Sequence, residues 1–277
     1  MTGICRLCLN NVELKESHII PKMFYKNIIR NSITGKMRVS NNVNRIVQDG
    51  LKTPFLCGKC EQQFSKYETY FSNEIFRKID KNPETFQINS KDNHLRYFIL
   101  SVSWRYAQFV YETELSKSVV DPSDGKTFTM EEIEKIKIIL ENWRKFLLDE
   151  NILEIQKIQM HLIPYVNIEE IECYEAINQN SVIPDFRTLD NENDFIYSFL
   201  FFKVPHLVIL CTLWGNTDSL KGYLVGKVIK SRNSKLPKHI HAVLNRSDRV
   251  FKESKEKLSE NQKQATFQRV QKELKDT

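Results

Sequence analysis

Glycine is scarce in this chain. Only 8 of the 277 residues are glycine, and they form no phosphate-binding loop, no dinucleotide-binding fingerprint and no Gly-x-Ser-x-Gly elbow. The enzyme classes that depend on these motifs are therefore excluded: NTPases, dinucleotide-dependent dehydrogenases and elbow-type hydrolases.

An uninterrupted membrane-spanning stretch is also missing. The longest apolar run, residues 195–214, is broken near its centre by Lys203, Pro205 and His206, so two strands explain it better than a membrane helix. The first residues lack the basic region and apolar stretch of a secretory signal. We expect a cytoplasmic protein that makes no membrane contact.

Charge is distributed unevenly along a chain that has enough apolar residues, 41% of the total, for one large or two modest globular domains. Residues 1–90 and 221–277 are net basic, whereas residues 91–220 are net acidic. Opposite charge in separate segments predicts distinct surfaces. The polar stretch at residues 80–93 contains Asn82-Pro83, a typical linker signal, and predicts domains at 1–90 and 91–277.

Four of the six cysteines form two Cys-x-x-Cys pairs, Cys5 with Cys8 and Cys57 with Cys60. This spacing lets both sulfurs of a pair bind one ion and predicts a structural Zn²⁺ with four thiolate ligands. The redox alternative needs only one pair, typically in a thioredoxin-like unit. Cys173 and Cys211 stand alone in apolar surroundings, as small buried thiols do.

Between the cysteine pairs lies His18, followed by Ile19-Ile20-Pro21, and the second pair opens a predicted aromatic-rich helix. In these features residues 5–68 resemble the HNH nucleases, in the zinc-finger form with two Cys-x-x-Cys knuckles around a ββα-metal unit of treble-clef type. The resemblance implies that His18 is the general base that activates water. It also implies a catalytic divalent cation (Mg²⁺, Mn²⁺ or Ni²⁺), held partly by an acidic residue before that histidine and by a His or Asn that closes the motif.

This chain departs from that pattern at two positions, because Ser17 precedes His18 and Glu61 follows Cys60. A carboxylate suits a hard cation, so Glu61 is a candidate ligand, although a negative charge in the first turn of a helix is also favourable by itself. Asp49 is a candidate second carboxylate, although Asp-Gly is above all a turn signal. Asn44 is one candidate for the middle Asn of the family, in competition with Asn31, Asn41 and Asn42.

The segment between the cysteine pairs is basic. Its cations include the candidate nucleic-acid contacts Lys22, Lys26, Arg30, Lys36, Arg38 and Arg45, and Asp49 is the only acidic residue between Lys22 and Lys52. This composition is typical of a surface that contacts phosphates. A solvated basic loop has the same composition, so charge alone does not decide.

Apolar periodicity predicts the rest of an α+β fold. One helical stripe comprises Phe64, Tyr67, Phe71, Ile75 and Ile79. Further helices are expected near residues 93–115, after the capping box of Thr129 and Glu132, and after Ser259 in the basic C-terminal segment. Strands are expected at residues 17–21, and at residues 158–165, 195–202, 207–214 and 222–229 as an antiparallel sheet of about four strands.

These observations favour an HNH-type endonuclease, a hydrolase that cleaves DNA phosphodiesters, with restriction or phage defence implied by analogy alone. A second interpretation is a non-enzymatic zinc module that binds nucleic acid or a protein, since Ser17 and Glu61 occupy the two ligand positions. A third is a toxin-type RNase. Self-association or a protein partner through residues 91–277 stays open.

Overall fold

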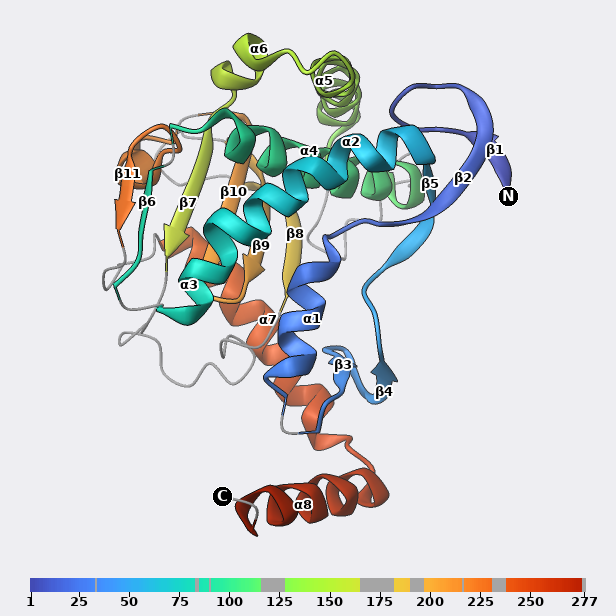
Figure 1. The fold of residues 1–277 in the computed structure, drawn as a ribbon, viewed down its shortest axis with the longest axis vertical. Helices are drawn as coiled ribbons and strands as arrows, with labels where there is room; N and C mark the ends of the chain where they lie inside the picture. The colour runs from blue at the N-terminus through green and yellow to red at the C-terminus, as the bar shows by residue number, and fades with distance from the viewer. Residues whose placement is uncertain are drawn as a thin grey trace.

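The computed structural model describes residues 1–32, 34–82, 85–89, 91–115, 128–164, 182–189, 197–215, 217–230 and 238–275. Its N-terminal elements are β1 (Thr2–Ile4), β2 (Asn11–His18), α1 (Lys22–Arg30), β3 (Met37–Val39), β4 (Asn42–Val47), β5 (Lys52–Cys57), α2 (Gly58–Tyr70), a π-helical segment (Phe71–Phe76), α3 (Arg77–Lys81) and β6 (Gln87–Asn89). The remaining elements are α4 (Asn93–Thr113), α5 (Met130–Leu148), α6 (Ile152–Lys157), β7 (Met160–Pro164), β8 (Ile183–Leu189), β9 (Tyr197–Val204), β10 (Leu207–Trp214), a 3₁₀ helix (Asp218–Tyr223), β11 (Val228–Lys230), α7 (Lys238–Glu256) and α8 (Glu260–Lys275). This mixture of helices and antiparallel sheets agrees with the predicted class (Figure 1).

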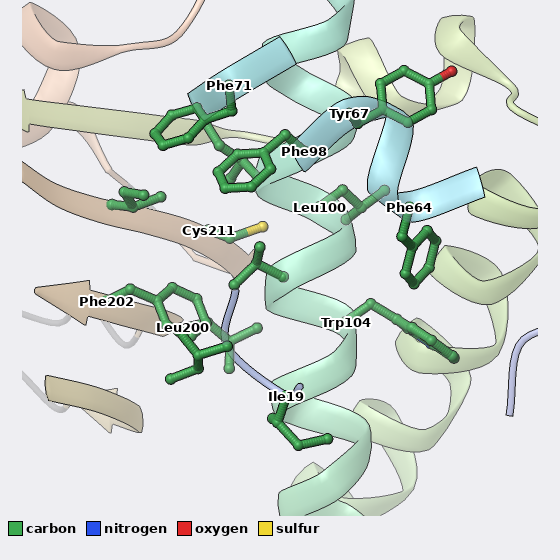
Figure 2. Packing of buried hydrophobic residues seen from close by; sticks show 14 of the residues in the cluster. Ile19, Phe64, Tyr67, Phe71, Phe98, Leu100, Trp104, Leu200, Phe202 and Cys211 are labelled. Atoms are coloured by element: carbon green, nitrogen blue, oxygen red, sulfur yellow. The ribbon is translucent and has the colours of Figure 1, made fainter. Parts of the chain in front are cut away.

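Helix α4 forms the centre of the packing. It begins after Asp92, whose side chain accepts a hydrogen bond from the His94 amide and so caps the helix. Its buried side chains lie on nearly every face and include Leu95, Tyr97, Phe98, Leu100, Val102, Trp104, Ala107 and Val110. Helices α2, α5 and α6 and strand β10 pack around it (Figure 2). Such all-round burial is expected of a helix that is apolar on more than one face.

The predicted stripe on the helix after Cys60 is confirmed, since Phe64, Tyr67, Phe71, Ile75 and Ile79 are all buried. The helix continues through the π-helical segment into α3. Phe71 stacks on Phe98 of α4 with ring centroids 3.9 Å apart, so the two helices are joined by aromatic contact as well as by buried area.

Helix α5 begins with the predicted capping box. The Thr129 hydroxyl accepts a hydrogen bond from the Glu132 amide, and the Glu132 carboxylate accepts one from the Thr129 amide. The apolar residues predicted to line this helix are buried: Ile133, Ile136, Leu140, Trp143 and Leu147. The Trp104 indole of α4 donates to the Leu140 carbonyl at 3.1 Å, which ties α5 to the central helix.

The large sheet has the strand order β7-β10-β9-β8 and is antiparallel throughout. Along β9, Leu200 and Phe202 belong to the core around α4, whereas Phe199 and Phe201 pack with apolar residues of α7. The sheet therefore has one helical layer on each face. Three of the predicted strands are present, and the turn that contains His206 joins β9 to β10 as expected.

The prediction that residues 222–229 form the fourth strand of this sheet was wrong. This segment contains the end of a 3₁₀ helix and the start of β11, which pairs with β6 outside the large sheet. Gly226 has φ +115°, a conformation that interrupts an extended run and that glycine adopts readily. The fourth strand is β8 instead, and its Pro184 and Asp185 weaken the apolar alternation that marks a strand.

In the N-terminal region, strands β1, β2 and β5 form an antiparallel sheet. The strand that carries His18 starts earlier than predicted and ends at this residue, opposite Lys52 of β5. The predicted C-terminal helix is present as α8, which lies at the end of the molecule farthest from α5 and α6 (Figure 1).

A single hydrophobic core includes residues from both sides of the predicted domain boundary, such as Phe64 and Phe71 before it and Phe98 and Trp104 after it. The division into two domains stays a prediction. None of the helices in the described ranges combines the length and the apolar composition that crossing a bilayer requires.

Substitution of Gly50 tests how tightly the loop next to Asp49 is packed. A Cβ atom at this position would lie 1.9 Å from Cε2 of the buried Tyr25 ring, so we expect Gly50→Ala to lower the free energy of unfolding by about 1 to 3 kcal/mol. The matched control is Gly58→Ala, because a Cβ there would only touch Lys15 at 3.6 Å. Thermal and urea unfolding measure both variants. Equal stability of Gly50→Ala and wild type would contradict the packing described here.

Candidate metal centre and candidate active site

The four paired cysteines come together at one point, as the sequence predicts. The four Sγ atoms all lie within 4.8 Å of one another. Among the described residues, no other group of three or more His, Cys, Asp or Glu side chains brings its ligand atoms this close together. The Cys8 and Cys57 sulfurs are 3.9 Å apart, close to the roughly 3.8 Å expected between two sulfurs bound tetrahedrally at about 2.3 Å from one ion. The cluster can therefore hold a metal ion.

The local fold explains why the sulfurs converge. Cys57 ends β5, and Cys60 lies in the first turn of α2, so the second pair occupies the corner where the strand becomes a helix. The first pair is held against it by the Arg6 amide, which donates to the Phe55 carbonyl at 3.0 Å. The Cys57 amide also donates to the Cys5 sulfur at 3.3 Å.

The surroundings of Cys5 favour its thiolate form. A hydrogen bond from Cys60 lowers the pKa of Cys5, with backbone amides in support, although burial alone would raise it, and the same contact raises the pKa of Cys60. A deprotonated sulfur is the form that binds a metal ion. From α5, Arg144 donates to the Leu7 carbonyl at 2.8 Å, which brings a cation close to this group of sulfurs.

His18 and Asp49, two of the predicted catalytic residues, contact one another. His18 Nε2 lies 2.7 Å from Asp49 Oδ1, and the two side chains are 19% and 23% exposed, so solvent reaches a mostly desolvated pair. Lys52 Nζ lies 2.5 Å from Asp49 Oδ2, and Lys22 Nζ lies 3.4 Å from the same atom. The Gly50 amide also donates to Asp49 Oδ1, at 2.9 Å.

These contacts keep Asp49 ionised. Burial alone would raise its pKa, but hydrogen bonds from Lys52, His18 and the Gly50 amide outweigh burial and lower the pKa well below the usual range. An ionised carboxylate only accepts hydrogen bonds, so Nε2 of His18 must donate to it. In the neutral imidazole the remaining nitrogen, Nδ1, then has a free lone pair that can take a proton.

Ser17 has a structural role in this arrangement. It is fully buried, and its hydroxyl accepts a hydrogen bond from the Leu56 amide at 3.1 Å and lies 3.3 Å from the Lys15 carbonyl. These bonds lie where the β2–β5 register shifts, between Lys15 and Glu16. Side chains alternate along a strand, so burial of Ser17 directs the His18 side chain to the opposite face.

Glu61 lies in the first turn of α2, half-buried, and its Oε1 is buried without a hydrogen-bond partner. It does not join His18 and Asp49 in a closely spaced group of three within the described chain. Both oxygens of Asp49 are already in contact with His18 or a lysine. The ligand set for a divalent cation that the family resemblance implies is therefore not gathered around these residues, and it stays a prediction.

The predicted basic residues fall into two groups. Lys22, Lys26 and Arg30 are the three exposed positions of α1, while the other side chains of that helix are buried or half-buried. Lys36 and Arg45 are exposed on the β3–β4 region, whereas Arg38 donates to the Val43 carbonyl and to Gln262 of α8.

Asn44 contacts the C-terminal helices. Its amide nitrogen donates to the Lys257 carbonyl at 2.8 Å, and its amide oxygen accepts from the Ser259 amide at 3.0 Å. Asn31 donates to the Asn27 side chain. The Asn44 side chain therefore binds the junction of α7 and α8, and the role of middle Asn stays unassigned.

Two residues next to the site were not predicted, Lys52 and Arg105. Arg105 of α4 donates to the His18 carbonyl at 3.0 Å and to Glu68 at 2.6 Å. Its position in the sequence contained a signal, because residue 105 continues the helical spacing of the buried Phe98 and Val102. A charged residue on such an apolar stripe indicates a specific buried partner.

Comparisons with known proteins assign the chain to no family, since no protein-family model, no curated protein and no solved structure matches it. The likeness to HNH nucleases therefore depends on the residues named above. The geometry that bears on function consists of the cysteine cluster and the His18–Asp49 pair with its two lysines.

We expect the purified protein to contain about one tightly bound metal ion per chain, the stoichiometry of a four-thiolate site. Cys60→Ser should lose this ion and unfold the N-terminal region, because metal binding and folding of such a site are coupled. Cys211→Ala is the matched control, since Cys211 is a buried thiol in β10 outside the cluster. Elemental analysis and circular dichroism measure both effects. Metal-free wild-type protein with the same fold would contradict the expectation.

Proposed function

We propose that the chain is an HNH-type endonuclease that cleaves DNA phosphodiester bonds and that the four cysteines bind a structural Zn²⁺. The observation that carries the proposal is the His18–Asp49 contact of 2.7 Å with Lys52 and Lys22 on the same carboxylate. A histidine oriented by a carboxylate and flanked by cations suits proton transfer next to an anionic substrate.

His18 is the general base in this proposal. With Nε2 donating to Asp49, Nδ1 takes a proton from the attacking water while the water oxygen bonds to phosphorus. The P–O bond to the leaving oxygen breaks, that oxygen takes a proton from solvent, and the Asp49 carboxylate stabilises the imidazolium that forms. Lys52 and Lys22 offset the negative charge that develops on the phosphate. These residues supply proton transfer and charge stabilisation without a step that passes through a bound cation.

The exposed cations of α1 support a nucleic-acid substrate. Lys22, Lys26 and Arg30 recur at every fourth residue, which puts them on one face of the helix about 6 Å apart along its axis. The first of them contacts Asp49, so this face of α1 starts at the candidate active site. We propose that a phosphate backbone follows α1 and brings one phosphodiester to His18.

The basic C-terminal segment extends this surface. Asn44 of β4 holds the junction of α7 and α8, and the Val43 amide donates to the Ser254 hydroxyl at 3.0 Å. The two basic parts of the sequence thus lie side by side although about 200 residues separate them. Cations from both parts can therefore contact phosphates of the same nucleic acid.

A second candidate function is a non-enzymatic zinc module that binds nucleic acid or a protein. The arrangement of Asp49 favours it, because lysines fill the place that a divalent cation would need. Both candidates use the same cationic surface and differ in whether His18 transfers a proton. RNA cleavage by the same site is a third outcome of the assay below.

His18→Ala should abolish DNA cleavage, since loss of a general base typically lowers a rate about a hundred- to ten-thousand-fold. The matched control is His94→Ala, which removes another His–Asp pair, with Asp92 at 3.1 Å, and should leave cleavage unchanged. The assay uses duplex DNA and RNA with Mg²⁺, Mn²⁺ or Ni²⁺, and with a chelator.

Glu61→Ala separates two roles of that carboxylate. Cleavage falls or needs more cation if Glu61 is a ligand, and it stays near wild type if Glu61 only offsets the helix dipole. Absence of cleavage by wild type in every condition would favour the binding module. Equal cleavage by His18→Ala and wild type would show that His18 is not the base.

Removing cations from the proposed surface should weaken DNA binding in a salt-dependent way. Lys26→Gln/Arg45→Gln should reduce the slope of log affinity against log salt by roughly 1.8, because each phosphate contact on duplex DNA contributes about 0.9. The matched control is Lys137→Gln/Lys145→Gln on α5, which lies at the other end of the molecule (Figure 1). Fluorescence anisotropy at several salt concentrations measures the slope. An equal loss in both double variants would refute the assignment of this surface.

A further inference from the structure

Arg105 is the most deeply buried charged residue that contacts the candidate site. Its side chain is only 2% exposed, and it lies in the middle of the central helix α4. Its guanidinium donates to the Ser101 carbonyl at 3.2 Å, to the His18 carbonyl at 3.0 Å and to Glu68 Oε1 at 2.6 Å. It also lies over the Phe64 ring, 5.2 Å from the centroid. One side chain therefore connects α4, α2 and the end of β2.

Stability alone does not explain why a charged residue lies at position 105. Arg105 is almost fully removed from water whereas Glu68 is 24% exposed, removal of a charge from water is costly, and replacement of buried ion pairs by apolar side chains is often neutral or stabilising. An apolar residue at position 105 would suit the surrounding core, which includes Phe64 and Trp104. The guanidinium offers something that an apolar side chain lacks, which is a set of fixed N–H groups pointing in different directions.

The backbone on both sides of His18 is fixed by other contacts. On one side, the Ser17 hydroxyl accepts from the Leu56 amide. On the other, the Ile19 amide donates to the Leu51 carbonyl at 3.1 Å, and the Ile19 side chain is buried close to α4 (Figure 2). The Arg105 bond supplies the contact at the His18 carbonyl itself. The imidazole is then left with few orientations, of which the Asp49 contact selects one.

We infer that Arg105 is a positioning residue for His18, and that Glu68 orients Arg105 for this role. The inference rests on the proposed function, because positioning matters for catalysis only if His18 transfers a proton. Arg105 acts through the backbone of His18 and does not touch the substrate. The part of the chain outside the cysteine-containing region thereby takes part in the reaction.

Two variants test the inference. Arg105→Met/Glu68→Gln removes both charges and leaves no unpaired buried ion, so it should fold. Arg105→Lys keeps a charge next to Glu68, but a single ammonium cannot reproduce the planar fork that reaches two acceptors. The matched control is Arg96→Met, because Arg96 lies on the same helix and donates to the Val225 carbonyl at 2.5 Å, in another part of the fold.

The first measurement is steady-state cleavage of duplex DNA. Both test variants should show a kcat about 10- to 100-fold below wild type, the size of effect that a misplacement of about 1 Å produces. KM, the melting temperature and the metal content should stay close to wild type, as should every parameter of Arg96→Met. A residue that only supported the fold would instead lower the melting temperature and leave kcat per folded molecule unchanged.

The second measurement does not depend on activity. NMR of protein with ¹⁵N-labelled histidine shows which ring nitrogen carries the proton, and His18→Ala identifies the His18 signals. Wild type should show one tautomer, with the proton on Nε2, whereas both test variants should show a mixture. Wild-type tautomer signals in a folded test variant would overturn the inference whatever the activity, and so would wild-type kcat. If wild type does not cleave, the proposed function fails while the spectra still decide whether Arg105 orients His18.

Discussion

Burial of α4 on nearly every side is the constraint on which the rest of the structure depends. A helix with apolar side chains around most of its circumference must be covered from several directions, and α2, α5, α6 and β10 provide that cover. The same requirement explains why the cysteine cluster is rigidly attached. Helix α2 starts at the second cysteine pair and packs on α4 through Phe64, and the π-helical segment that continues it packs on α4 through Phe71, so the cysteine cluster is anchored in the central core.

Electrostatics distinguishes the two candidate sites. In the cysteine cluster, four sulfurs lie close enough together to bind one cation, with backbone amides nearby. At Asp49 the negative charge is already compensated by the protein, because two lysines and a histidine surround one carboxylate. The first arrangement suits a permanent metal ion. The second suits an anionic substrate, since a phosphate that approaches Lys22 and Lys52 exchanges one anionic partner for another.

The sequence predicts the features that depend on local spacing. The two Cys-x-x-Cys pairs, the capping box at Thr129 and the aromatic stripe on α2 were all visible, because each depends on residues a few positions apart. His18 and Asp49 were both selected, but their contact was not predictable, since they are 31 positions apart and a helix and two strands lie between them. The edge strand β8 was missed because its proline and charged residues resemble those of a loop.

The partners of Arg105 could not be predicted from the sequence. A charged residue on an apolar helical stripe indicates that it has a buried partner, but the sequence does not identify that partner. The structure provides two, the Glu68 carboxylate and the His18 carbonyl. Both belong to the region that carries the cysteine pairs, whereas Arg105 belongs to the helix that organises the core. The orientation of His18 is therefore determined by the whole fold, and the resemblance of residues 5–68 to a nuclease motif covers only part of the structure that a working site would need.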